Sequence, residues 1–304
     1  MSTRAPSLPL LRHLLVLVAM SLPPTPSAAG RTGEDAVSAR PHAPESGAAL
    51  ARSLGGDGLY RMSASFRSFA GEPLRLSFTL ARADSERAMR EFGASVPEVA
   101  SLVQSCIHDP KCDPARETAR YYRERGLRIR QERGQRATLS VDVPFAVQRN
   151  VQRVAPLADA LRRLTAERGE NRIWAMEAAV ALVQTSLAYR QPETWENGRK
   201  IVGFYPPPRA LEQGYGDCDT KSALLAALLL QLTDAKLIGV HVPEHYLLGI
   251  AGKPRPGQAF LTHDGVTYVL VEAAGPALRP PGDVSPTTAA ALRKREGLRI
   301  DPIT

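Results

Sequence analysis

The chain has 304 residues, of which 43% are hydrophobic and 23% are charged, and its formal net charge at pH 7 is +8. This length suffices for one large domain or two small ones with a buried core, and the composition is ordinary for a globular protein. The positive excess is mild, and the arginines between residues 125 and 136 alternate with acids and turn residues without aromatic residues among them. This pattern favours a solvated face and argues against a nucleic-acid partner. No nucleotide, flavin or haem motif is visible, and we expect no cofactor.

The first 29 residues have the pattern of an export signal. Arg4 and Arg12 precede a short apolar core at residues 14–22, and the small residues at 27–29 suit cleavage before Gly30. Because the core is too short to span a bilayer, we expect a cleaved signal peptide and a periplasmic or extracellular protein. An uncleaved N-terminal anchor is the alternative. Cleavage removes two arginines and no acids, which lowers the formal charge from +8 to +6, and leaves no expected membrane span.

The next stretch, residues 30–52, is rich in Ala, Pro, Gly, Ser and Glu without periodicity, which predicts a disordered linker. An α+β region is predicted at 53–170, with two strands, two helices, two further strands joined by a turn at 132–135, and an amphipathic helix. In that order, the expected elements are 59–69, 74–81, 84–105, 116–125, 127–130, 137–143 and 151–168.

Two of the three cysteines lie close together in this region. Cys106 and Cys112 flank the turn-prone pair Asp109-Pro110. In an exported chain, a disulfide that closes this small loop is the natural interpretation. A zinc site is disfavoured because only His108 is close enough to add a ligand. The pairing leaves Cys218 as an unpaired thiol, which indicates a reactive cysteine.

The residues from 171 to 285 are predicted to form a second domain of helices and strands. Apolar residues from Ile173 to Leu187 recur at the three-four spacing of a helix with one buried face. The run at 223–232 is apolar nearly all round, which predicts a helix buried inside the domain. The segment 190–208 is irregular and aromatic, and we interpret it as the wall of a cleft. Four strands are expected to follow, at 236–241, 245–251, 258–263 and 266–271.

The last two strands flank Asp264-Gly265, a strong hairpin signal. Beyond them the chain becomes Pro-rich and then mildly helical, and we expect residues 286–304 to form a C-terminal tail.

The segment before the buried helix has the features of a nucleophile site. Gly214 and Gly216 suit a tight loop, and Asp217 is a good N-cap residue. Cys218 then falls in the first helical turn, where free N–H groups and the helix dipole favour a thiolate. Such settings lower a thiol pKa from ~8.5 to roughly 3.5–7.5, and we predict that Cys218 is the nucleophile.

A cysteine nucleophile needs a base and a group that orients the base. His245 begins a predicted strand after a turn, where it can project from a sheet edge toward the helix. His263 is expected to be solvated beside a hairpin tip, and His241 to be packed at a strand end. Glu272 ends an apolar strand, where a carboxylate is unusual without a partner.

Together, residues 216–222, His245 and Glu272 resemble the transglutaminase-like superfamily, over roughly residues 171–281. The resemblance implies a papain-like α+β fold with a triad of nucleophile Cys218, base His245 and orienting acid Glu272. It also requires the strand at 258–263 to be a side excursion, because only then do the start of the His245 strand and the end of the Glu272 strand meet.

Further polar residues are candidates for the same site. Asp217, Asp219 and Lys221 could tune the thiol or bind substrate, although capping and helix electrostatics account for the two aspartates. Lys221 is disfavoured at a helix N-terminus, so we expect it to pair with an acid or to serve a specific role. The backbone N–H of Cys218 is the first oxyanion donor expected. The candidates for the second donor are Trp195, Asn197 and Tyr215.

Residues 241–245 also fit the His-x-x-Glu-His pattern of certain zinc peptidases. That pattern binds zinc only when both histidines share a helix face, and Pro243 together with β-like flanks argues against a helix. No metal is therefore predicted.

The sequence thus predicts an exported cysteine enzyme that cleaves or transfers an acyl group at an amide bond of a peptide or protein substrate. Water as the second substrate would give a protease or amidase, and an amine would give a transglutaminase. The alternative is a non-catalytic binding or scaffolding module of the cell envelope, with a protein partner there. A metal-dependent hydrolase depends on the zinc pattern and falls with it.

Overall fold

The computed structural model describes residues 50–130, 137–295 and 297–304. The predicted signal peptide, most of the predicted linker and the turn at 132–135 lie outside these residues. The linker was predicted to reach residue 52, but Leu50–Leu54 form strand β1, which pairs with the next strand. The chain is of mixed α+β architecture, as predicted.

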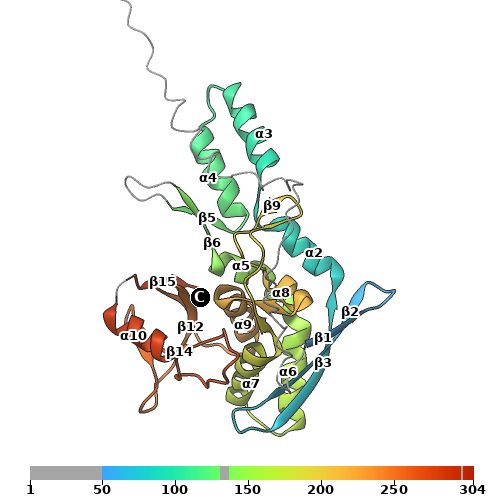
Figure 1. The fold of residues 1–304 in the computed structure, drawn as a ribbon, viewed down its shortest axis with the longest axis vertical. Coiled ribbons are helices and arrows are strands. Elements are labelled where there is room, and N and C mark those ends of the chain that lie inside the picture. The colour runs from blue at the N-terminus through green and yellow to red at the C-terminus, as the bar shows by residue number, and fades with distance from the viewer. Residues whose placement is uncertain (1–49, 131–136, 296) are drawn as a thin grey trace, which may run out of the picture.

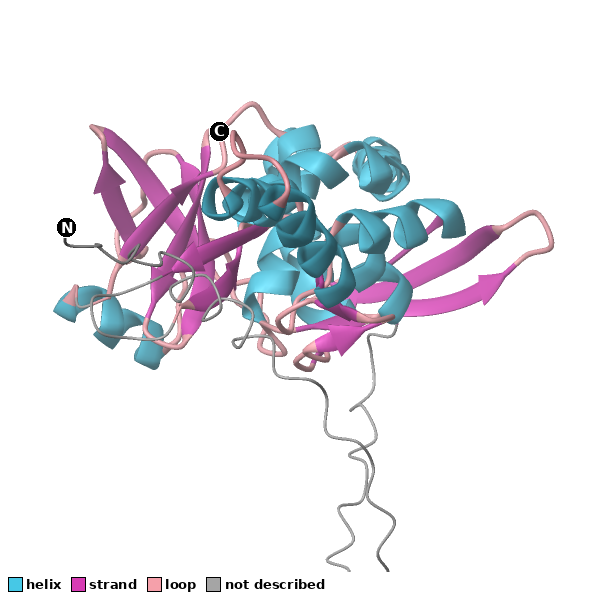
Figure 2. Cartoon of the chain, turned by 90° about the horizontal axis from the view of Figure 1, so that it is seen from above, coloured by secondary structure: helices cyan, strands magenta, loops and turns pink. Residues whose placement is uncertain are grey.

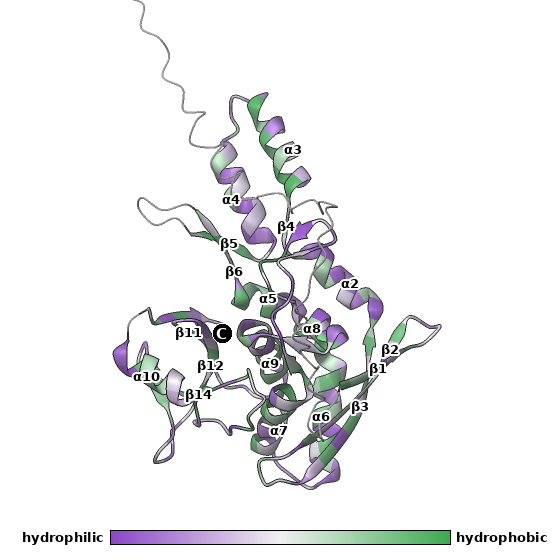
Figure 3. Cartoon of the chain, viewed as in Figure 1, coloured by the Kyte–Doolittle hydropathy of each residue, from purple (hydrophilic) through white to green (hydrophobic). Residues whose placement is uncertain are grey.

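An antiparallel meander opens the fold. β1 pairs with β2 (Leu59–Arg67), which pairs with β3 (Pro73–Ala81). Hydrophobic side chains alternate along β2 and β3, so one face of the meander is buried against helices and the other is largely exposed. Figure 3 shows both hydrophobic and hydrophilic residues along these strands.

The helix predicted at 84–105 is two helices, α2 (Arg82–Glu91) and α3 (Val96–Ile107). Gly93 divides them, because it has a φ of 78° and approaches the Lys200 carbonyl so closely that a Cβ would lie 2.9 Å from that oxygen. The chain then forms the short strand β4 (Ala94–Ser95) before α3 begins.

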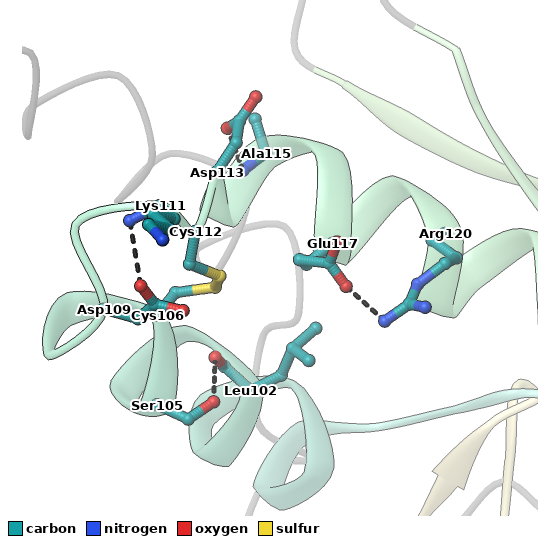
Figure 4. The surroundings of a disulfide bond; sticks show 10 residues. All are labelled: Leu102, Ser105, Cys106, Asp109, Lys111, Cys112, Asp113, Ala115, Glu117 and Arg120. Carbon is teal, nitrogen blue, oxygen red and sulfur yellow. Dashed lines mark hydrogen bonds and ion pairs between the residues drawn. A yellow bond between two sulfur atoms is a disulfide. The ribbon is translucent and has the colours of Figure 1, made fainter.

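A disulfide joins the ends of the next two helices. α3 and α4 (Pro114–Glu124) form a hairpin that projects from the body of the molecule (Figure 1), and α3 is the more hydrophobic of the two (Figure 3). The predicted Cys106–Cys112 disulfide closes the turn between them (Figure 4). Asp113 caps α4 by accepting the N–H of Ala115.

Between residues 127 and 167 the structure differs from the predicted elements because it contains short helices. β5 (Leu127–Arg130) and β6 (Thr138–Val141) form the predicted strand pair. The sequence analysis missed α5 (Val143–Asn150), which begins where the second strand was expected to end. A 3-10 turn at Gln152–Val154 then precedes α6 (Ala155–Glu167), so the helix predicted at 151–168 starts several residues later.

Three helices form the centre of the molecule, α7 (Arg172–Ser186), α8 (Pro207–Gln213) and α9 (Cys218–Leu232). As predicted, α9 is apolar and buried nearly all round. Helix α7 buries its C-terminal two-thirds, whereas Ile173, which was expected on the buried face, is 62% exposed. The predicted irregular segment at 190–208 contains the hairpin of β8 (Trp195–Glu196) and β9 (Arg199–Lys200).

A five-stranded sheet covers the other side of α9. Its order is β13-β14-β12-β11-β15, and β12 (His245–Ala251) pairs directly with β14 (Val266–Val271). Because Leu248 pairs with Val271, the start of β12 lies beside the end of β14. The predicted arrangement is therefore confirmed: β13 (Phe260–His263) does not lie between β12 and β14 but forms the outer edge of the sheet beside β14.

The segment expected to be a tail is part of this sheet. After α10 (Pro286–Lys294), β15 (Arg299–Pro302) pairs with β11 (Leu237–Val242). Side chains of α10 pack on the face of the sheet opposite α9. The last residues of the chain therefore complete the fold.

The layers can be followed in Figure 2, where most of the helices lie between the five-stranded sheet and the meander, while α10 packs on the other face of that sheet. One hydrophobic core runs from β2 through the helices to Ile303, across the domain boundary predicted at residue 170. Within the described ranges, the structure has no helix that is long and apolar enough to cross a membrane.

Candidate active site

Cys218 occupies the first turn of α9, where the sequence placed it. The Asp217 side chain caps the helix by accepting the N–H of Thr220 at 3.4 Å. Gly216 is required at the preceding position, because a Cβ there would lie 2.3 Å from Cγ2 of Thr220. The loop therefore delivers the thiol, which is half-buried, to the N-terminal end of a rigid helix.

A tyrosine that the sequence analysis missed lies beside the thiol. β7 (Ala188–Tyr189) pairs in parallel with β10 (Tyr215–Gly216), immediately before α9. Burial raises the pKa of Tyr189, and so does its closeness to Cys218 and the neighbouring aspartates. The tyrosine is 53% exposed, so it borders the thiol on the solvent side. The pairing of two two-residue strands gives no sequence signal that could have predicted this contact.

The pKa of the Cys218 thiol is raised, whereas the sequence predicted that it is lowered. Burial, followed by the charges of Asp219 and Asp217, raises the pKa of Cys218 to about 12, although the backbone N–H groups of Tyr246 and Asp219 act to lower it. The predicted fall is therefore wrong for the resting thiol, because the two aspartates that cap the helix also repel a thiolate. Burial, together with a hydrogen bond and repulsion from Asp217, raises the pKa of Asp219 well above its usual range.

The predicted base and acid face each other across neighbouring strands. His245 begins β12 and Glu272 directly follows β14, and Nε2 of the histidine lies 3.7 Å from Oε1 of the glutamate. This geometry leaves Nδ1 as the histidine nitrogen that can receive another proton.

Glu272 is buried and held in place from several sides. Its Oε1 accepts hydrogen bonds from Oγ1 of Thr288 at 2.5 Å and from the N–H of Ser285 at 3.1 Å, and Nε of Arg279 lies 3.8 Å from Oε2. Burial raises the pKa of Glu272, but the contact with His245 and the hydrogen bonds from Thr288 and Ser285 outweigh it and bring the pKa to about 2. The segment predicted as a tail supplies Thr288.

Strand β12 is tied to the first turns of α9 at its opening residues. The backbone N–H of Tyr246 is close enough to the sulfur of Cys218 to act against the rise of the thiol pKa. Oγ of Ser222 donates to the carbonyl of the same tyrosine at 3.4 Å. Since Tyr246 follows His245, these contacts bring Cys218 and His245 into one neighbourhood.

Lys221 has no acidic partner among its hydrogen bonds, in contrast to the expectation. Its Nζ donates to three backbone carbonyls, those of Gln184 at 3.1 Å, Leu187 at 3.0 Å and Ala274 at 2.5 Å. The side chain is fully buried, and burial lowers its pKa to about 7.

The other histidines have separate environments. Nε2 of His241 lies 2.8 Å from Oδ2 of Asp301 in β15, and its ring packs edge-on against Tyr246. Nε2 of His263 lies 3.4 Å from Oδ2 of Asp264 at the hairpin tip. The segment from His241 to His245 is strand, turn and strand, as predicted, so it lacks the helix that the zinc pattern requires.

Two of the three candidates for a second oxyanion donor, Trp195 and Asn197, share one hairpin, and the third, Tyr215, lies on another strand. Trp195 is in the β8–β9 hairpin, with Nζ of Lys200 5.8 Å from its ring centroid. Asn197 lies at the turn of that hairpin and lines a hollow with Arg209. The hydroxyl of Tyr215, in β10, lies 3.0 Å from that of Tyr205. None of these contacts brings a donor to Cys218.

Comparisons of the chain with protein-family models, with curated proteins and with solved structures give no match.

Proposed function

We propose that this protein is a cysteine enzyme of the transglutaminase-like type, with a papain-like core, that acts on an amide bond of a peptide or protein. One observation carries the proposal. A cysteine at the start of a buried helix is tied to the strand that begins with His245, and His245 faces the buried, charged Glu272. A nucleophile, a base and an orienting acid are the three parts that such catalysis needs.

The reaction follows from these positions. His245 takes the thiol proton as the sulfur attacks the carbonyl carbon, and the backbone N–H of Cys218 stabilises the developing oxyanion. His245 then gives the proton to the leaving amine, and the acyl group remains on sulfur as a thioester. Water releases an acid and an amine releases a new amide, and either step restores the thiol. Glu272 holds the imidazole and stabilises its protonated form.

The high pKa of the resting thiol supports one way of forming the proposed nucleophile. Burial and the aspartates disfavour a free thiolate at neutral pH. We therefore infer that His245 removes the proton during attack, as a general base, instead of holding a preformed ion pair.

The high pKa of Cys218 also supports the second candidate, a non-catalytic module of the cell envelope that keeps the fold and binds a protein partner. A thiol with a pKa of about 12 is inert unless a base assists it. In both cases the Cys106–Cys112 disulfide supports an exported protein, periplasmic or extracellular.

Alkylation of native Cys218 by iodoacetamide at pH 7 distinguishes the two candidates. If His245 acts as a base, we expect labelling to slow about tenfold or more in His245→Ala and in Glu272→Gln. His263→Ala is the matched control, since that histidine lies at a hairpin tip and should leave the rate unchanged. Cys218→Ser confirms the labelled site.

Equal rates in the unmodified protein and in His245→Ala would contradict the enzyme and favour the binding module. If the rates differ, exposure to peptide amides with hydroxylamine as acyl acceptor should yield hydroxamates that Cys218→Ser does not form.

A further inference from the structure

Resting on the function proposed above, we propose that Lys221 is a positioning residue, which holds the loop that carries Glu272 in register with the helix that carries Cys218. The geometry points to this role because one ammonium group joins three separate segments around the site. These are the first turns of α9, the end of α7 with the strand that follows it, and the loop after β14.

The ammonium group is matched to its surroundings. A lysine ammonium has three donors and no acceptor, and Nζ of Lys221 makes three bonds to three backbone carbonyls. An apolar side chain of similar length would leave those carbonyls buried without donors, which is costly. The side chain itself is fully buried, so the bonds do not compete with solvent.

One of the three bonds acts on the acid. The carbonyl of Ala274 lies two residues beyond Glu272, and its bond to Lys221 fixes the loop where it leaves the sheet. The other end of the lysine is one helical turn from Cys218, so this one side chain links the helix of Cys218 directly to the loop of Glu272.

Gln184 adds a second tie to the same loop. Its Nε2 donates to the carbonyls of Glu272 at 2.7 Å and Arg279 at 2.8 Å, and its Oε1 accepts the N–H of Arg279 at 2.9 Å. Gly275 fits closely over the Gln184 backbone, because a Cβ there would lie 2.1 Å from the Gln184 carbonyl oxygen. The loop is therefore held against α7, and Lys221 connects that assembly to α9.

A third bond reaches the solvent side of the site. The carbonyl of Leu187 precedes β7, the strand that places Tyr189 beside the thiol. The lysine thus orders the segment before Tyr189 and the loop after Glu272, which lie on two sides of Cys218.

A double-mutant cycle separates positioning from general stability. Lys221→Met removes the three donors at similar length, and we expect it to slow alkylation of Cys218 at pH 7 by about tenfold, since small displacements of a catalytic group reduce rates strongly. In the Glu272→Gln background the same substitution should have little further effect, because the lysine acts through the acid. The matched control is Leu228→Ala, a fully buried change in the same helix, which should lower the melting temperature without slowing alkylation.

The outcomes are distinct. An unchanged rate in folded Lys221→Met, or equal slowing with and without Glu272, overturns the positioning role. If Lys221→Met does not fold, Lys221→Gln, which keeps two donors, replaces it in the cycle, and failure of both to fold assigns the lysine to folding and also overturns the role. Loss of the proposed function shows separately, as a rate in the unmodified protein that ignores His245 and Glu272.

Discussion

Glu272 is a buried carboxylate that the fold keeps charged. Its three main partners come from β12 and from the segment that begins α10, and they hold its pKa at about 2, below the ordinary value of 4.5. Because the unfolded chain binds the proton more readily, the stability that this group contributes is present above pH 4.5 and is lost as the pH falls toward 2.

We therefore expect the free energy of unfolding to fall by on the order of 3 kcal/mol between pH 4.5 and pH 2 on account of this one group. Glu272→Gln should flatten that part of the profile, as measured by urea unfolding at each pH. Glu170→Gln, at an exposed position, is the control and should leave the profile unchanged. A profile with the same slope in both variants would contradict the assignment.

The aspartates at the start of α9 set the resting state of the thiol. Their charge acts with burial to raise the pKa of Cys218. Changing both Asp217 and Asp219 to Asn keeps side-chain oxygens as acceptors for the helix N–H groups but removes the charge.

In this double variant we expect the pH midpoint of Cys218 alkylation to move down by about one unit or more. Asp234→Asn, at a surface ion pair with Arg172, is the matched control. A midpoint that stays in place would mean that burial alone holds the thiol protonated.

At the scale of elements, the α3–α4 hairpin stands apart from the site. Its disulfide closes a loop with a sequence separation of 6, at the end of a projecting hairpin. Loop closure of this length restricts the unfolded chain by about 2 kcal/mol.

Replacing both Cys106 and Cys112 by Ala should therefore lower the free energy of unfolding by about 2 kcal/mol and leave the alkylation rate of Cys218 unchanged. Urea unfolding and labelling at pH 7 measure the two effects. Slower labelling in this variant would show that the hairpin is coupled to the site.

The longest apolar elements could be predicted from the sequence, and the shortest could not. The helix behind Cys218 and the strands that begin with His245 and end before Glu272 have strong local patterns, and the structure has them at nearly the predicted residues. The helices α5 and α8 have only 8 and 7 residues, too few for a clear periodicity. The division of the helix predicted at 84–105 depends on Gly93 meeting a strand that lies more than a hundred residues later.

Within the candidate site too, residues with a local sequence pattern could be predicted and residues placed by distant contacts could not. Cys218, His245 and Glu272 could be selected because each stands at the end of a recognisable element. The acceptors of Lys221 and the donors to Glu272 come from loops and from a helix start that are distant in sequence. The pKa of Cys218 was predicted with the wrong sign because the helix rule considers the dipole and omits tertiary burial.

At the scale of the whole molecule, the C-terminal residues close the sheet. β15 covers the edge of β11, Asp301 joins His241 and Arg128, and Ile303 is buried in the main core. An uncovered strand edge and a vacated core position both destabilise a fold.

A chain shortened to end at Leu298 should therefore unfold with a free energy lower by about 2 kcal/mol or more. Arg299→Ala, an exposed change in the same strand, should have little effect and serves as the control. Equal stability of the shortened and full chains, measured by thermal and urea unfolding, would contradict this account.

The continuous core has a practical consequence for how this protein can be studied and recombined. A fragment of residues 171–285 contains all three candidate catalytic residues, yet it lacks Thr288, the edge strand β15 and the meander that covers the central helices. Such a fragment would fail to fold for reasons unrelated to its chemistry. Expression libraries and domain fusions designed around the motif alone would therefore give no information on the proposed activity, and a fragment for such work should include β1 to β15.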